Sequence, residues 1–246
     1  MIASIDKQKA IPPADLDALH LRMQTALEIT DRLVKVIGNA VGAVEERKGK
    51  LYQDKTAEKL ILSQLQAGDI LLEKTPFRLT DKMIPGYWGH AAIWVGNKQE
   101  LENQGLWNTP LVAKYHKQIQ KQHGVVEALR DGTAMNTIGH FLNIDDLLVL
   151  RKKNFTRLDQ KRVIELSLRQ VGNPYDFNYD IETTDKIVCS QLVYLAYTDI
   201  DWPTDNLVGR YTISPDNIAQ KALQGGELEV MLLYIEGNLL SGELTQ

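Results

Sequence analysis

Two side chains in this sequence could together carry out nucleophilic chemistry. Cys189 is the only cysteine in 246 residues, so it can form neither an internal disulfide nor a cysteine-based metal site. It lies at the expected start of a helix, where exposed backbone N–H groups and the helix dipole lower the pKa of a thiol. His90 opens an expected strand, and an imidazole presented from there could accept the thiol proton. A buried core residue is the alternative for Cys189, because free cysteine is among the most buried residue types.

The order of motifs along the chain bears on this choice. A histidine motif, Gly-His-Ala-Ala-Ile-Trp-Val-Gly, occupies residues 89–96, and Val-Val-Glu-Ala-Leu follows at 125–129. Further motifs lie at residues 67–71, 142–147, 172–177 and 189–194. Together they resemble the circularly permuted NlpC/P60 family, the YiiX/YebB-like branch of the papain-like cysteine hydrolases, over roughly residues 64 to 235. In that family the histidine strand comes first, an acidic strand second and the cysteine helix last.

The resemblance implies a catalytic role for one cysteine, one histidine and one acidic residue. Cys189 would be the nucleophile, His90 the general base and Glu127 the acid that orients the imidazole. Residues 188–191 read Val-Cys-Ser-Gln, where Tyr-Cys-Ser-Glu is commoner in the family, and this departure concerns the subsites more than the reaction. Glu102 is the competing third member, although it lies in a long insertion. A surface carboxylate on a strand edge is the alternative interpretation of Glu127.

Three aromatic residues near these motifs are candidates for substrate binding. They are Tyr87 and Trp88, just before His90, and Tyr175, in the loop before the cysteine helix. Tyr87 and Tyr175 are also candidates for a second oxyanion donor beside the Cys189 backbone N–H. Packing in the core is the alternative for Trp88. The sequence predicts no metal site and no cofactor, because His116 and His123 have no ligand cluster around them.

Helix and strand periodicities predict an α+β fold. Strands are expected at 69–73, 90–95, 125–129, 146–151 and 229–235, and helices at 56–65, 157–171, 188–197 and 215–223. The resemblance specifies this as a permuted papain-like or NlpC/P60 fold, with an antiparallel sheet or partial barrel packed against helices. We divide the chain into an N-terminal helical extension, residues 1–63, and a catalytic domain, residues 64–246. The segment 97–124 is too long for a hairpin loop and suggests a flap over the site.

The N-terminal extension carries an apolar stripe at helical spacing. Its members recur every three or four residues: Leu16, Leu19, Met23, Ala26, Leu33, Ile37, Ala40 and Val44. So long an apolar row must be buried. We expect it to pack on the catalytic domain, and a homodimer formed through this helix is the alternative.

Composition excludes several classes of partner. A net charge of −4 without a long run of one sign argues against nucleic acid and anionic membranes as partners. No window approaches the roughly 18 apolar residues of a transmembrane span, and no secretory signal is evident. A single free thiol suits a reducing compartment, so we expect a cytoplasmic location.

These observations lead to three competing functions. The leading hypothesis is a cysteine hydrolase that cleaves an amide bond, peptide or isopeptide-like, in a small peptide, amide or acyl substrate. The second keeps the acyl-enzyme but acts on lipid acyl groups, as an acyltransferase or thioesterase. The third is a binding module that keeps the fold without the reaction. A thiol-reactive acyl probe separates enzyme from module, and liposome binding separates the lipid enzyme from the amidase.

Overall fold

The computed structural model describes residues 15–19, 21–22, 47–78, 86–129, 131–174, 188–207 and 210–240. Its centre is a seven-stranded sheet in the order β4-β3-β2-β1-β5-β8-β9, in which every neighbouring pair is antiparallel. The strands are β1 (Ile70–Lys74), β2 (His90–Trp94), β3 (Val125–Leu129), β4 (Gly132–Asn136), β5 (Asp146–Lys152), β8 (Leu228–Ile235) and β9 (Asn238–Leu239). The expected α+β class, with an antiparallel sheet packed against helices, is confirmed, and the sheet is not closed into a barrel.

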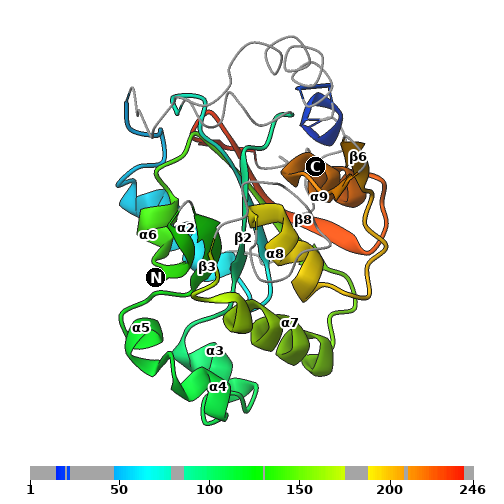
Figure 1. Cartoon of the computed structure of the whole chain (residues 1–246). Helices are drawn as coiled ribbons and strands as arrows, with labels where there is room; N and C mark the ends of the chain where they lie inside the picture. The colour runs from blue at the N-terminus through cyan, green and yellow to red at the C-terminus, as the bar shows by residue number, and fades with distance from the viewer. Residues whose placement is uncertain are drawn as a thin grey trace, which may run out of the picture.

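Helices cover both faces of this sheet (Figure 1). One face packs against α7 (Arg157–Gln170), α8 (Cys189–Ala196) and α9 (Pro215–Leu223). The other face packs against α2 (Lys55–Gln64) and α6 (Ile138–Phe141). Successive side chains of a strand point to opposite faces, so each strand supplies apolar residues to two separate clusters. Strands buried on both sides account for the nearly continuous apolar runs in the sequence.

Local sequence fixes where the main helices begin. The side chains of Asp54, Thr156 and Ser214 accept hydrogen bonds from backbone N–H groups in the first turns of α2, α7 and α9. Pro215 occupies the first position of α9, where its missing N–H costs nothing. These caps explain why α2, α7 and α9 lie within one residue of their expected bounds at each end; α8 agrees equally closely, although no side chain caps it.

The insertion at residues 97–124 forms three short helices rather than an irregular loop. They are α3 (Lys98–Asn103), α4 (Pro110–Ala113) and α5 (His116–Gln120). The insertion leaves the end of β2 and returns at the start of β3, whereas His90 stands at the beginning of β2. Figure 1 shows α3, α4 and α5 gathered at one end of the molecule, beside α7. The expectation of a flap over the site is therefore wrong, because the antiparallel topology places this segment at the far end of the strand.

The segment before α2 is attached to the body of the molecule. The Arg47 guanidinium donates to both carboxylate oxygens of Asp145, at 2.8 and 2.5 Å. The Gly49 N–H donates to the Asn143 side chain at 2.8 Å, and Leu51 is fully buried. Leu19, one member of the expected apolar stripe, is buried in the cluster that includes α7, α8 and α9.

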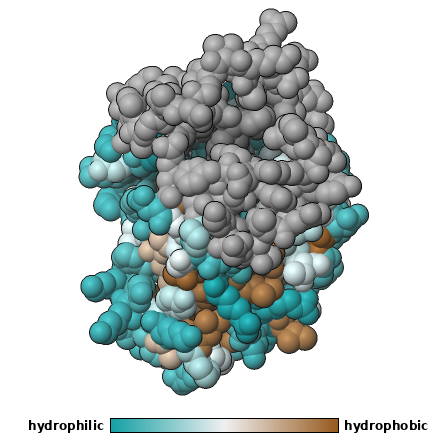
Figure 2. All heavy atoms as spheres, viewed as in Figure 1, coloured by the Kyte–Doolittle hydropathy of each residue, from teal (hydrophilic) through white to brown (hydrophobic). Residues whose placement is uncertain are grey.

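Most of the expected N-terminal helix lies outside the described residues. Of the stripe, Leu16 and Leu19 fall within the described ranges, whereas the positions from Met23 to Val44 do not. The domain boundary at residue 63 stays a prediction. None of the helices in the described ranges is long and apolar enough to cross a bilayer. On the face drawn in Figure 2, hydrophilic residues make up most of the described surface, with apolar residues in small groups among them.

Gly49 gives a direct test of the packing before α2. A Cβ added there would lie 2.2 Å from the Ile144 backbone nitrogen, which is far inside contact distance. We therefore expect Gly49→Ala to lower the free energy of unfolding by about 1–3 kcal/mol, because backbone must shift to accept the methyl group. Gly226→Ala is the matched control, since its Cβ would make ordinary contact at 3.7 Å. Urea denaturation measures both, and equal stability of the two variants would contradict the packing.

Candidate active site

Cys189 is the first residue of α8. The preceding Val188 is extended, and its N–H donates to the Gln191 side chain at 3.4 Å, which helps to close the first turn. Ser190 is buried, and its hydroxyl donates to the Ile213 carbonyl at 2.5 Å. The thiol thus sits at the N-terminus of a helix that is anchored beside it, and its exposed fraction is 5%. This is the helix position that the sequence predicted.

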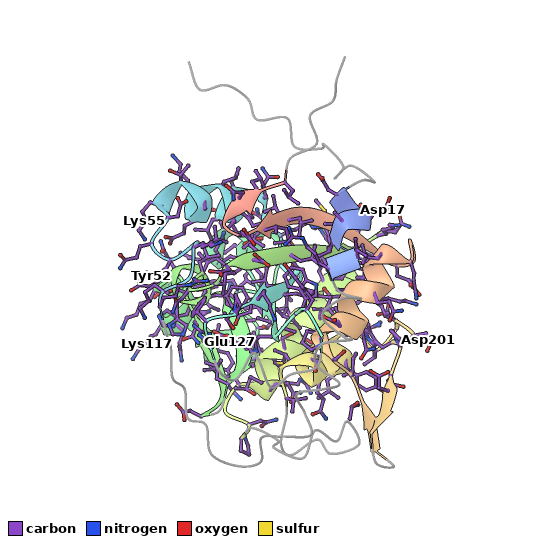
Figure 3. The ribbon with its side chains drawn as sticks, turned by 90° about the horizontal axis from the view of Figure 1, so that it is seen from above. Asp17, Tyr52, Lys55, Lys117, Glu127 and Asp201 are labelled. Atoms are coloured by element: carbon purple, nitrogen blue, oxygen red, sulfur yellow. The ribbon has the colours of Figure 1, made fainter. Side chains whose placement is uncertain are left out.

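The sheet brings His90 and Glu127 together from adjacent strands. Ala92 on β2 pairs with Glu127 on β3, and side chains two residues apart on a strand share a face, so His90 and Glu127 project to the same side. His90 Nε2 lies 2.9 Å from Glu127 Oε2. Figure 3 shows Glu127 within the body of the molecule, whereas Lys55, Lys117 and Asp201 lie at its periphery. Glu127 is therefore a buried partner of the imidazole and not a strand-edge surface carboxylate.

The thiol lies where β2 and β3 separate. Their pairing begins only at Ala92 and Glu127, so the Ala91 amide lies beyond the ladder. The Ala91 N–H and the Ser190 N–H both donate to the sulfur of Cys189, and the His90 ring also bonds to the sulfur. Because Nε2 of His90 faces Glu127, the ring nitrogen left for the thiol is Nδ1. Cysteine, histidine and glutamate thus form one continuous row.

Proton affinities within this row favour an ion pair. Burial raises the pKa of the Cys189 thiol, but the His90 imidazolium and the hydrogen bonds from His90, Ala91 and Ser190 outweigh it, and the net pKa is lowered. Burial lowers the pKa of His90, but Cys189, Glu127 and Glu73 outweigh it and raise that pKa well above its usual value. A thiol that loses its proton easily beside an imidazole that holds one is the activated state of a cysteine nucleophile.

Asn136 on β4 extends the row by one residue. Its side-chain amide donates to Glu127 Oε1 at 2.8 Å, so both carboxylate oxygens of Glu127 are bonded. Burial raises the pKa of Glu127, but the hydrogen bond and charge of His90 and the hydrogen bond from Asn136 lower it overall, which keeps the carboxylate ionised. Asn136 was not among the predicted site residues, because β4 itself was not expected; the polar side chain nine residues after Glu127 was its only signal.

Glu73 is a second buried carboxylate beside the imidazole. It lies on β1 directly opposite His90 in the strand register and is 4% exposed. Arg78 lies 3.6 Å from its Oε1. Its negative charge contributes to the raised pKa of His90. Glu73 has no local signal in the sequence, because its place beside His90 depends on the pairing of β1 with β2.

The other candidate site residues expected from the sequence are Tyr87, Trp88, Tyr175 and Glu102. Tyr87 is buried, and its hydroxyl donates to Asp146. Burial raises the pKa of Tyr87, and the neighbouring Asp146 raises it further. Trp88 is fully buried, and its indole N–H finds no hydrogen-bond partner among the described residues. Tyr175 lies outside the described residues. Glu102 lies on α3, next to Lys98 at 3.5 Å and at the far end of β2, so it is not the third member.

The two histidines of the insertion are held by local contacts. His116 stacks on Trp107 with ring centroids 3.8 Å apart, and its Nε2 bonds to the Trp107 carbonyl. His123 Nδ1 bonds to the Met135 carbonyl at 2.9 Å. Within the described ranges, histidine, cysteine and acidic side chains form no group of three able to hold a metal ion.

Comparisons with known proteins place this geometry in a family. The model of the permuted papain-like amidase enzymes, the YaeF/YiiX or C92 family, matches residues 64–238. Among solved structures, the crystal structure of metalloprotein yiiX from Escherichia coli O157:H7 is similar at 16% identity with a TM-score of 0.43, covering 70% of this chain and 89% of that one. A search of curated proteins found no match. The family match covers well over half of the sequence and includes the histidine, glutamate and cysteine motifs, and the chain therefore belongs to the permuted papain-like amidase family.

Proposed function

We propose that this protein is a cysteine amidase that cleaves an amide bond, peptide or isopeptide-like, through an acyl-enzyme on Cys189. The observation that carries the proposal is the continuous hydrogen-bonded row from the thiol through His90 to Glu127. Membership of an amidase family supports the same bond type. In this proposal His90 is the general base and acid, and Glu127 is the orienting acid.

The row can supply each proton that the reaction needs. The thiolate attacks the carbonyl carbon of the amide, and the electron pair of the carbonyl moves onto its oxygen. The His90 imidazolium then gives its proton to the amide nitrogen, the carbon–nitrogen bond breaks, and an amine leaves. Neutral His90 next takes a proton from water, whose oxygen attacks the thioester and releases a carboxylate and Cys189. Glu127 holds the ring in the orientation that both transfers require.

The helix start supplies a donor for the oxyanion. The N–H of Cys189 is at the first position of α8, where a backbone N–H has no partner within the helix. Such a preorganised donor stabilises the negative oxygen of the tetrahedral intermediate, and losing one donor in enzymes of this kind costs about 10²–10³-fold in rate. Of the two tyrosines considered as a second donor, Tyr175 remains the proposed source, because the Tyr87 hydroxyl already donates to Asp146.

The proposed substrate-binding residues are Tyr87, Trp88 and Tyr175. Trp88 has the clearest support, because it is two residues from His90 and carries a buried indole N–H without a partner among the described residues. Tyr87 has its hydroxyl bonded to Asp146, so its ring rather than its hydroxyl is the part proposed to meet substrate. Self-association through the N-terminal helix and a cytoplasmic location also stay predictions.

An acyl-substrate panel tests the proposal. The intact protein is incubated with matched amides, thioesters and lipid esters, and mass spectrometry then locates any acyl adduct and measures its decay in water. We expect an adduct on Cys189 from amide substrates and its loss as the free acid. An adduct formed only with lipid esters, or transferred to an added acceptor in preference to water, would favour the acyltransferase alternative.

The proposed orienting role of Glu127 can be tested by substitution. Replacing Glu127 with Gln should reduce turnover, but this variant should remain about two orders of magnitude faster than one that lacks His90. The orientation of the ring is impaired, while the base itself remains. Asn136→Ala should reduce turnover less again, since Glu127 keeps its bond to His90. The matched control is Glu102→Gln, which removes the competing acid on α3. If the Glu102 and Glu127 variants turn over substrate at equal rates, Glu127 has no orienting role.

A further inference from the structure

The first turn of α9 contacts both halves of the proposed active site. Ile213, just before α9, accepts a 2.5 Å hydrogen bond from Ser190, the neighbour of the nucleophile. Three residues later, Asp216 accepts bonds from the backbone N–H groups of Tyr87 at 2.9 Å and Trp88 at 2.7 Å. Residues 87 and 88 lead directly into His90. One short stretch therefore bonds to the nucleophile helix on one side and to the base strand on the other.

The Asp216 carboxylate is built into this position. It is 5% exposed, and each of its two oxygens takes one of the two consecutive N–H groups. The N-terminus of α9 adds a favourable dipole for a negative charge in its first turn. Gly86 completes the fit, because a Cβ there would lie 2.4 Å from Asp216 Oδ2. The backbone before His90 therefore packs closely against the Asp216 carboxylate.

This geometry matters because the two catalytic groups stand on separate elements. Cys189 belongs to a helix and His90 to a strand, and the thiol–imidazole contact depends on how the two are held relative to each other. A misplacement of about 1 Å at a reacting pair can cost 10²-fold in rate. The turn from Ile213 to Asp216 fixes that separation through three hydrogen bonds.

We propose that Asp216 is a positioning residue for the reaction: its carboxylate holds the chain before His90 at the distance from Cys189 at which the thiol and imidazole share a proton. This inference rests on the proposed function of Cys189 and His90. Asp216 acts through the backbone of residues 87 and 88 and touches neither the reacting atoms nor the substrate.

Thiol alkylation by iodoacetamide as a function of pH tests the inference without a known substrate. In the full chain, Asp216→Asn should shift the alkylation profile to higher pH, toward an ordinary cysteine, because one oxygen acceptor is lost and the imidazole moves away. Turnover of any substrate identified by the acyl panel should fall at least about tenfold, mainly in kcat. Asp216→Glu keeps the charge but displaces the carboxylate, and it should shift the profile in the same direction.

Glu100→Gln is the matched control. Glu100 is a partly buried carboxylate that also accepts two backbone N–H groups, from Ala67 at 2.8 Å and Asn97 at 2.9 Å. It lies beyond the far end of β2 from His90, so this variant should lose thermal stability and keep the parent profile. The other charged groups around the pair are unchanged in all these variants: Glu127 on β3, Glu73 on β1 with Arg78, and His140 on α6, which acts on Glu127.

The outcomes separate the inference from the proposed function. A profile of Asp216→Asn that matches that of Glu100→Gln would overturn the positioning role and leave Cys189 catalysis untouched. A shift in Asp216→Asn with none in Asp216→Glu would assign the effect to charge and overturn it too. If Asp216→Asn does not fold, the Glu variant alone decides, with an unshifted profile counting against the inference. An ordinary cysteine profile in the parent protein would instead contradict the proposed function.

Discussion

Replacing Cys189 with alanine is expected to abolish turnover while the protein stays folded. Loss of a nucleophile costs roughly four to six orders of magnitude in rate, because the residues of such a site act as one unit. The packing cost is small, since a single buried sulfur atom is lost at the start of α8. Turnover with a substrate from the acyl panel, circular dichroism and thermal unfolding measure the two effects together.

Cys189→Ser is the control for this substitution. Serine fills nearly the same space, but its hydroxyl ionises far less readily than a thiol, so the serine variant should also be inactive and should unfold at close to the parent temperature. Hydrolysis of a confirmed amide substrate at the parent rate by the alanine variant would exclude Cys189 as the nucleophile. The family would then supply the fold alone to this protein.

Replacing His90 with glutamine is expected to have the second largest effect. Turnover should fall nearly as far as in the Cys189 variant, because no other group in the row can take the thiol proton. The alkylation profile should also change. The His90 imidazolium lowers the thiol pKa in the parent, and without it burial alone raises that pKa. Reactivity that rises at low pH in the parent should therefore rise only at higher pH in the variant.

A histidine outside the row provides the matched control. His123→Gln removes an imidazole that bonds to the Met135 carbonyl beyond the row, and it should leave both turnover and the thiol profile at parent values. If the His90 and His123 variants gave the same alkylation profile, the thiol and His90 would not be a pair.

The pH dependence of turnover in the parent protein follows from the lowered pKa of Cys189 and the raised pKa of His90. Below the lowered pKa of Cys189 the thiol is protonated and cannot attack. Above the raised pKa of His90 the imidazolium is lost and the amine leaving group receives no proton. Turnover should thus follow a bell-shaped curve whose two limbs belong to the coupled pair. Stopped-flow or steady-state rates across pH measure the curve, and a profile rising through a single ordinary cysteine pKa would contradict it.

Features with a local signal were predictable from the sequence. Alternation identified β3 and placed Glu127 on the face opposite Val126 and Ala128, as observed. The Ser214-Pro215 cap located α9 to the residue. The order of His90, Glu127 and Cys189 identified the family because each motif occupies its own element.

Features that depend on pairing across the sheet were not predictable. β4 is short and contains Gly132, Ala134 and Asn136, which are residue types depleted in strands, so neither hydrophobicity nor β-propensity identifies it, and Asn136 was missed with it. Glu73 and Asp216 become neighbours of the His90 strand only through long-range contacts. The helices of the insertion escaped notice because each is six residues or shorter, which leaves too few turns for a period to show.

In the sequence, α9 follows both β2 and α8, the elements that carry His90 and Cys189, and this order has a consequence for how the proposed site is assembled. A chain leaving the ribosome exposes His90 and Glu127 first, Cys189 much later and Asp216 after that. A nascent chain therefore carries the proposed acid–base half of the site before the proposed nucleophile. When the thiol emerges, the turn from Ile213 to Asp216 has not yet joined the two halves. On the proposed function, activation of the cysteine would then wait until residues 213–216 have been synthesised and α9 has packed in place.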